Sequence, residues 1–540
     1  MFSLRSLLPL LVSVAACGGG GGAASDGTTT TGGGGGGTSS KPAQAGDVSI
    51  DVPAFKIEGK LFEPQALGRP GIPTSPPKKK ITLAQQRTLV TNTKDPVVKQ
   101  AHAVGLATMI YLEAKAKGGA DEKTMMEDAR KVLRDTVATV GDKVVEDVSL
   151  LFLASYEMYF EDWVAADKAW GALLAKSPKD KDAPYFKTWW GYSLLKQFKN
   201  AEALAAVAGE PVDSKTPELA YVIAWAKWRA GDDAGAWTAM VAAAKGWTGT
   251  REIINDELYL FAARSNTPWE QATKQLNDVF LAKQNLQQYE VLVKLGLKAY
   301  GFSGRWADGV ACLDKAMVLI GKAAPVNDVP VVRYSQADFT VRLDNPEASM
   351  KYGKQAIDAL PACGAKCSPK EQQDLINAIA GIARVFHFVY ATSNDVRYYE
   401  PANQLYLAAI PVIMDPTVRA ERNADATKLQ ATMKNTKAGT GTHDKDAIRV
   451  LAERHNLEIS ACYEGVLVSN PKLGGNLTLT LESDQSGIIK GAASEPKGGA
   501  ADIAAVATCV VDAAKTWKLP KRGMPGNTRI KLTYQLSPKK

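Results

Sequence analysis

The chain has 540 residues, of which 45% are hydrophobic and 23% are charged, and its formal net charge is +8 at pH 7. This length is sufficient for about two to four domains, and the hydrophobic fraction is typical of globular proteins. The positive charge is spread along the chain, without clusters of Arg and Lys interleaved with stacking aromatic residues, which argues against nucleic acid as a partner. The four histidines are few for a metalloenzyme.

The first residues have the order of a secretory signal. Arg5 supplies a positive charge, Leu7–Val14 is an apolar run too short to span a bilayer, and small residues precede a cysteine. The sequence Val14-Ala15-Ala16-Cys17 resembles the lipobox of bacterial lipoproteins. That resemblance implies a signal peptide over 1–16, cleavage before Cys17, and lipid on the sulfur and the new amino group of Cys17. The alternative is an ordinary signal peptide with a chance cysteine.

These residues also predict a location. Gly18 follows the cysteine, which in the sorting rule of enteric lipoproteins favours the outer membrane. Past the signal we find no apolar run near the length of a transmembrane helix, so lipid is the expected membrane attachment. We therefore expect a periplasmic protein, anchored to a bacterial membrane in an oxidising compartment.

Two segments of low complexity come next. Residues 17–46 are rich in Gly, Ser and Thr and lack the apolar residues to bury, so we expect a disordered leash about 30 Å from end to end. Residues 47–80 are Pro-rich, and we expect a mostly irregular, extended segment that can lie along the next domain.

Residues 81–434 are helical almost without a break and contain an internal repeat. Small residues that would open the second helix of each repeat recur in steps of 35, 35, 36, 37 and 39 residues, at Ala166, Ala201, Ala236, Ala272, Gly309 and Ala348. An aromatic residue lies three positions earlier in four copies, at Trp163, Phe198, Trp269 and Trp306. A turn precedes it, at Glu161-Asp162, Lys196-Gln197, Gly231-Asp232 and Gly304-Arg305.

This pattern resembles the tetratricopeptide repeat, a helix-turn-helix unit of about 34 residues. The resemblance implies a mainly α fold, a tetratricopeptide-like α-solenoid, in which stacked helix pairs share one core. Some copies depart from the family: Asp233 replaces the aromatic residue in the third, and Pro346-Glu347 opens the sixth. A seventh pair is expected over Lys370–Asp415, with Ala402 in the small position.

Ten of the eleven tryptophans fall between Trp163 and Trp306. Four of them belong to first helices, which line the inner face of such solenoids, and are candidates for a binding groove: Trp189, Trp190, Trp225 and Trp228. Packing between repeats is the alternative. Adjacent helical residues point about 100° apart, so at most one of Trp189 and Trp190 can face a groove.

Three internal cysteines need an assignment. Cys363 and Cys367 form a C-x3-C pair in an expected loop, and a local disulfide is favoured over metal because no further ligands lie nearby at zinc-like spacing. Cys312 lies in a helical pattern and is expected to be a buried free thiol.

After a linker over 435–445, residues 446–540 change character and predict a small α+β domain. Helices are expected over Asp446–Leu457, Ile459–Ser469 and Asp502–Trp517, and strands over Asn476–Glu482, Ile488–Ala493 and Thr528–Leu536. The domain resembles the C-terminal family named after the myxobacterial gliding proteins AgmX and PglI, a relative of the TonB C-terminal domain. The resemblance rests on Cys462-Tyr463-Glu464, Asn470-Pro471-Lys472-Leu473, Gly475, Gly487, Cys509 and Trp517-Lys518-Leu519-Pro520. It implies a disulfide between Cys462 and Cys509, which would stabilise the domain by about 4 kcal/mol.

A basic cluster surrounds one tryptophan of this domain, at Lys515, Trp517, Lys518, Lys521, Arg522, Arg529 and Lys531. It could contact an anionic envelope polymer or an acidic partner, or it could be a solvated surface. We find no phosphate-binding G-x4-G-K-[ST], H-E-x-x-H or G-x-S-x-G motif, and we expect neither an enzyme nor a cofactor or metal site.

Together these observations predict a lipid-anchored adaptor of the cell envelope. It would bind envelope proteins through its repeats and its TonB-like domain, in an assembly that the family resemblance associates with gliding motility. The alternative is a lipoprotein that binds peptidoglycan or another glycan. Energy transduction like that of TonB needs a transmembrane helix and is disfavoured, because the expected anchor is lipid.

Overall fold

The computed structural model describes residues 47–539, apart from residues 78, 141–143, 266, 285–287, 324–327, 364–367, 436–444, 498–500 and 522–524. It divides into two compact units. The amino-terminal unit is Phe62–Thr267, and the carboxy-terminal unit combines Pro268–Lys540 with the chain up to Leu61. This division falls inside the stretch 81–434, which the sequence predicts to be one domain. Helix pairs continue on both sides of the division, so the repeat pattern does not mark it.

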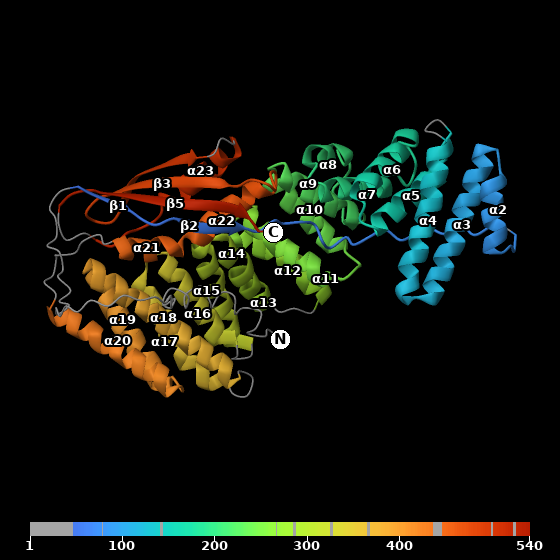
Figure 1. The fold of residues 1–540 in the computed structure, drawn as a ribbon. Coiled ribbons are helices and arrows are strands. Elements are labelled where there is room, and N and C mark those ends of the chain that lie inside the picture. Colours follow the sequence, from blue (N-terminus) through green and yellow to red (C-terminus); the bar gives the residue numbers. More distant parts are fainter. Residues whose placement is uncertain are drawn as a thin grey trace, which may run out of the picture. The chain divides into compact units, whose positions relative to one another are not determined.

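The amino-terminal unit is built from helices packed in antiparallel pairs (Figure 1). Its helices are α2 (Leu83–Asn92), α3 (Pro96–Lys117), α4 (Gly119–Val140), α5 (Asp147–Tyr159), α6 (Trp163–Lys176), α7 (Ala183–Lys196), α8 (Asn200–Ala206), α9 (Pro217–Arg229), α10 (Asp233–Gly246) and α11 (Arg251–Arg264). Fully buried aromatic side chains such as Trp170, Tyr221 and Trp225 fill the space between neighbouring helices. One core is therefore shared by successive pairs, as in a solenoid.

The helix pairs of the carboxy-terminal unit follow the same pattern. Its helical array consists of α12 (Trp269–Gln284), α13 (Gln288–Lys294), the π-helical turn η3 (Leu295–Tyr300), α14 (Gly301–Ser303), α15 (Trp306–Ala323), α16 (Asp328–Arg342), α17 (Pro346–Cys363), α18 (Pro369–Ser393), η5 (Val396–Tyr398), α19 (Tyr399–Ala409), η6 (Ile410–Val412) and α20 (Pro416–Asn435). In the described part of the chain, Pro369–Ala391 of α18 is long and apolar enough to cross a membrane, but 56% of its most apolar window is buried in the protein. A core helix of a globular protein has the same properties.

A left-handed residue ends the first helix of five repeats. Glu161, Phe198, Gly231, Gly304 and Asp344 have φ between 52° and 84°. At each turn the next amide donates to the carbonyl five residues back, in the bonds Asp162→Glu157, Lys199→Leu194, Asp232→Lys227, Arg305→Tyr300 and Asn345→Thr340, at 2.9–3.1 Å. This Schellman geometry closes the first helix and starts the second.

The turns correct the repeat register in two copies. In the second copy the left-handed residue is Phe198, so the turn lies at Gln197-Phe198, later than the predicted Lys196-Gln197. Ala201 is exposed and Ala203 is the fully buried small residue. In the sixth copy Ser349 rather than Ala348 is fully buried. The small residue lies four positions after the residue that caps the second helix, which the sequence alone did not locate.

A small mixed sheet forms the last part of the carboxy-terminal unit. Its elements are α21 (Lys445–Arg454), α22 (Asn456–Leu467), β3 (Gly475–Ser483), β4 (Ile489–Lys497), α23 (Ala501–Ala514) and β5 (Thr528–Pro538). Leu477, Leu479 and Leu481 of β3 are buried under α22 and α23, as their alternation predicts. The predicted mainly α solenoid with a small α+β domain is confirmed.

The sheet also contains two strands from the other end of the chain. β1 (Val48–Asp51) and β2 (Phe55–Gly59) pair in parallel with β5, with Ile50 opposite Ile530 and Ile57 opposite Leu536 (Figure 1). The strand order is β1-β5-β3-β4, with β2 also on β5. The expectation of irregular chain over 47–80 is therefore wrong for these two strands, whose apolar side chains complete the core of the sheet.

Candidate functional site

The inner face of the amino-terminal unit holds an extended part of its own chain, Phe62–Ser75, which we call the inner segment. Side chains of three first helices bond its backbone. Arg229 Nη2 donates to the Phe62 carbonyl at 3.2 Å, and Tyr192 Oη donates to the Pro64 carbonyl at 3.2 Å.

Two further bonds involve amides of the inner segment. The Gln65 amide donates to Glu257 Oε1 at 2.9 Å, and the Ala66 amide donates to Tyr221 Oη at 3.1 Å. At the far end, the Ser75 amide donates to Thr108 Oγ1 of α3 at 2.9 Å. The inner segment is thus recognised mainly through its peptide groups.

The aromatic and charged contacts of the inner segment concentrate at its start, whereas Ile72 near its end packs against the apolar core of α3, α4 and α5. The Phe62 ring lies 6.0 Å from the Trp228 ring and 6.0 Å from the Arg264 guanidinium, measured to the ring centroid. Glu63 forms an ion pair with Lys196 at 2.6 Å, and this lysine side chain is only 17% exposed. A second ion pair, Arg69–Glu161, is well exposed and contributes little.

Helical periodicity explains why these groups share one face. Residues three, four and seven apart lie on the same side of a helix. The residues that contact the segment follow that spacing on α7 (Tyr192, Lys196), on α9 (Tyr221, Trp228) and on α11 (Glu257, Arg264), and Trp225 and Phe261 pack between them on the same face. The first helices of successive repeats therefore present one continuous polar and aromatic stripe.

Burial changes the acid–base properties of two of these groups. Burial raises the pKa of the Glu257 carboxyl to about 7, although hydrogen bonds from Tyr221, Gln65 and Trp225 act in the opposite direction. Burial lowers the pKa of Arg229 to about 10. Arg229 also donates to the Leu195 carbonyl and lies 4.4 Å from the centroid of the Phe198 ring.

Two of the four candidate tryptophans, Trp225 and Trp228, contact the inner segment or the residues that bind it. Trp225 is fully buried and donates its indole N–H to Glu257 Oε2 at 3.3 Å, and Trp228 contacts Phe62. Trp189 is 6% exposed and lies among aromatic rings, and the half-buried Trp190 donates to Asp167 Oδ1 at 2.8 Å. These indoles pack inside the protein and do not form an open aromatic wall.

Part of the inner face remains open. A cavity of about 400 Å³ lies at the amino-terminal ends of α7 and α9. It is lined by Pro184, Tyr185, Thr188, Trp189, Lys215, Thr216, Glu218 and Leu219. Tyr185 and Trp189 precede Tyr192 by seven and three residues, so the cavity continues the stripe that binds the inner segment.

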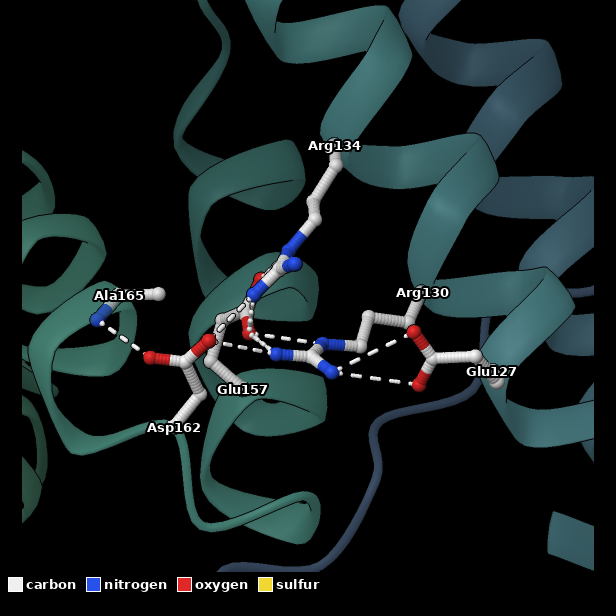
Figure 2. A network of polar contacts seen from close by, with 6 residues as sticks. All are labelled: Glu127, Arg130, Arg134, Glu157, Asp162 and Ala165. Carbon is white, nitrogen blue, oxygen red and sulfur yellow. Dashed lines mark hydrogen bonds and ion pairs between the residues drawn. The ribbon is translucent and has the colours of Figure 1, made fainter.

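A charged network joins α4, α5 and α6 of the same unit (Figure 2). The fully buried Glu157 accepts from Arg130 Nε at 2.8 Å and from Arg134 Nη2 at 2.6 Å. Both arginines also contact Asp162, whose other oxygen caps α6 by accepting from the Ala165 amide at 3.2 Å. Every charge in Figure 2 is paired, so the network fixes α4 against α5 and α6.

In the carboxy-terminal unit, Trp517 of the predicted basic cluster is buried. Its ring stacks on His455 at 4.1 Å, and its indole N–H donates to Glu458 Oε2 at 2.7 Å. The indole of Trp306 donates to the other oxygen of Glu458 at 2.7 Å. Burial raises the pKa of Glu458, but the bonds from His455 and both indoles outweigh it, and the pKa is lowered overall. This carboxylate joins α22 to the helical array.

The cationic residues of that cluster are dispersed. Lys515 pairs with Asp512 at 2.8 Å, and the Lys521 amide donates to Asp395 at 2.9 Å. Lys518 is exposed. Arg529 and Lys531 point outward on β5, where their strand neighbours include Glu482 and Asp51. Arg522 lies outside the described residues.

The cysteine assignments divide in the same way. Cys462 and Cys509 are joined by a disulfide that ties α22 to α23, with their Cα atoms 5.7 Å apart. Cys312 is buried, forms no disulfide, and has its pKa raised by burial. Cys17 and Cys367 lie outside the described residues, as does the side chain of Cys363, and so does the predicted local disulfide between Cys363 and Cys367. Among the described residues, no three His, Cys, Asp or Glu side chains gather as metal ligands would.

Sequence reasoning missed the residues that bind the inner segment. Tyr192, Tyr221, Arg229 and Glu257 look like ordinary helical residues, and only their place among apolar neighbours on first helices marks them. A polar residue on the expected buried stripe of several first helices is the signal that could have found them.

Comparisons with known proteins bear on the fold alone. No known protein family and no curated protein matches the chain. Among solved structures, a tetratricopeptide repeat protein from Parabacteroides merdae ATCC 43184 is similar over 53% of this chain and 98% of its own length. The sequence identity is 13% and the TM-score is 0.26.

Proposed function

We propose that the protein is a non-enzymatic scaffold of the bacterial cell envelope, anchored by lipid at Cys17 and binding partner proteins through its helical repeats. This proposal rests on the hydrogen bonds between the inner face and the inner segment. The side chains of the inner face bond the carbonyl and amide groups of an extended chain, which is how a solenoid surface recognises protein rather than a small metabolite.

The small sheet domain supports the envelope assignment. Its order of helices and strands is the one expected from the resemblance to the AgmX/PglI-type, TonB-like family, and it contains the Cys462–Cys509 disulfide. Disulfides persist in oxidising compartments such as the periplasm. We infer that this domain docks to a second envelope protein, and that the assembly resides at the outer membrane.

The glycan alternative has weaker support. Sugar binding by tryptophan needs an accessible ring face, and Trp189, Trp225 and Trp228 are all less than 10% exposed. Retention of the purified protein on cell-wall sacculi, with loss of retention after Trp190→Ala, would favour it over protein binding.

Site-specific photo-crosslinking in native envelopes tests the scaffold proposal. A photoreactive residue replaces Tyr185, which is 43% exposed at the open cavity, and the matched control places it at Val164, which is 66% exposed on a second helix. We expect defined protein adducts from the first position only. Equal adducts from both positions, or none from Tyr185, would contradict protein binding at the inner face.

Fatty-acid labelling tests the anchor. We expect labelled fatty acid in the wild-type chain, loss of label in the Cys17→Ser chain, and release of that variant from the membrane fraction. Label that survives the substitution would contradict attachment at Cys17.

A further inference from the structure

The inner segment is seated like a ligand. It has no helix and pairs with no strand between Phe62 and Ser75, so its ordered contacts in the described structure are those with the helices around it. Pro64 and Pro70 are its buried residues, and most of the others are half-buried or exposed. Its removal would break none of the hydrogen bonds within the helices.

Bonds to the peptide groups of this segment contribute affinity for any extended peptide, whereas contacts with its side chains contribute specificity. Tyr192, Tyr221 and Glu257 bond peptide groups, which every extended peptide possesses. Specificity for the side chains comes from two contacts. The Phe62 ring lies near Trp228 and Arg264. Glu63 forms an ion pair with Lys196.

An empty inner face would be costly. Glu257 is 8% exposed and Arg229 is 4% exposed, and departure of the segment removes one hydrogen-bond partner from each. Glu257 keeps its bond from Trp225 and Arg229 keeps its bond to the Leu195 carbonyl, but each loses one bond that another extended peptide would restore, so exchange of one peptide for another is easier than vacancy.

We propose that the inner segment is a tethered competitor, and that a partner binds the inner face by replacing it with an extended peptide in which an aromatic residue precedes Glu and Pro, as in Phe62-Glu63-Pro64. This inference rests on the proposed scaffold function and names the partner's chemistry. The segment is continuous with β2 before it and leads to α2 after it, so it acts at a high effective concentration. A free peptide must overcome that competition, which lowers its apparent affinity.

Fluorescence anisotropy on the purified full chain tests this competition. The probe is a labelled synthetic peptide of residues 61–76, LFEPQALGRPGIPTSP. Glu63→Lys in the protein places a cation beside Lys196 and should release the segment. We expect the variant to bind the probe at least tenfold more tightly than the wild-type chain. The matched control, Glu58→Lys, makes the same charge change at an exposed position of β2 and should bind like wild type.

A charge exchange tests the specificity. In the Glu63→Lys/Lys196→Glu chain the segment recovers its ion pair, so weak binding of the Glu63 probe should return. The Lys196→Glu chain should bind a probe carrying Glu63→Lys in preference to the original probe. Equal affinity of wild type and Glu63→Lys for the original probe, or equal affinity of Lys196→Glu for both probes, would overturn the proposal.

Hydrogen exchange supplies a readout that does not need a probe. The amides of Gln65 and Ala66 are bonded in the docked segment and should exchange slowly in wild type and quickly in Glu63→Lys, with the helices unchanged. Slow exchange at both amides in the variant would refute release. These assays need neither lipid nor envelope, so their failure would leave the crosslinking test of the scaffold function intact.

Discussion

Glu257→Gln should remove a pH dependence from the stability of the amino-terminal unit. The carboxyl of Glu257 is buried against Trp225, Tyr221 and the amide of Gln65, and burial raises its pKa from 4.5 to about 7. A carboxyl whose pKa is higher in the folded state binds its proton more tightly there. Between pH 4.5 and 7 the folded state therefore holds the extra proton, and stability falls as the pH rises.

The size of the effect follows from the two pKa values. A tenfold change in acidity corresponds to 1.36 kcal/mol, so the rise from 4.5 to about 7 costs on the order of 3 kcal/mol of stability across this window. Glutamine has the same shape and does not titrate. The free energy of unfolding of the variant should therefore lack this fall between pH 4.5 and 7. All other groups titrate alike in both proteins, so the difference between the two pH profiles isolates Glu257.

Urea unfolding at a series of pH values from 4.5 to 8 measures the difference. Eight of the eleven tryptophans lie in the amino-terminal unit, so tryptophan fluorescence reports mainly on it. The control is Glu252→Gln, an exposed position on the same helix, which should keep the wild-type profile. If Glu257→Gln keeps the wild-type slope as well, the carboxyl titrates outside this window and the reasoning from burial is refuted.

Three further predictions concern the stability of the fold. Glu458→Ala leaves two indole N–H groups without their acceptor and should cost about 3 kcal/mol in the urea unfolding of the carboxy-terminal unit, whereas Glu453→Ala breaks a surface ion pair and should cost under about 1 kcal/mol. Equal losses would contradict the junction role of Glu458. Replacing Cys462 and Cys509 with Ala opens a loop between residues 47 apart and should cost about 4 kcal/mol, measured as the shift in urea midpoint, with no shift opposing the loop-closure argument. Glu157→Ala removes the buried carboxylate that Arg130 and Arg134 share and leaves them Asp162 as a common partner; it should cost about 3 kcal/mol by circular dichroism of the amino-terminal unit, and a cost near zero would show that the network is dispensable.

The helical repeats and the small sheet could be predicted because their signals are local. Small residues recur at helix crossings, and Leu477, Leu479 and Leu481 alternate with polar residues along β3. The exact register could not be predicted in every copy. Gly231 and Gly304 mark the left-handed position of the turn in two copies. In the second copy this position is Phe198, and a phenylalanine gives no sign of a turn in the sequence.

The inner segment and the strands before it escaped prediction for a different reason. Val48–Asp51 and Phe55–Gly59 do alternate, with Ile50, Val52, Phe55 and Ile57 buried, but Pro53 interrupts the pattern and the paired strand β5 lies more than 470 residues away. Short strands are stable only with a partner, and nothing local names that partner. The same holds for Phe62–Ala66, whose peptide groups bond side chains from helices that begin more than a hundred residues later. One stretch of about thirty residues thus completes a sheet and then fills a binding face, which is why composition alone makes it look like a linker.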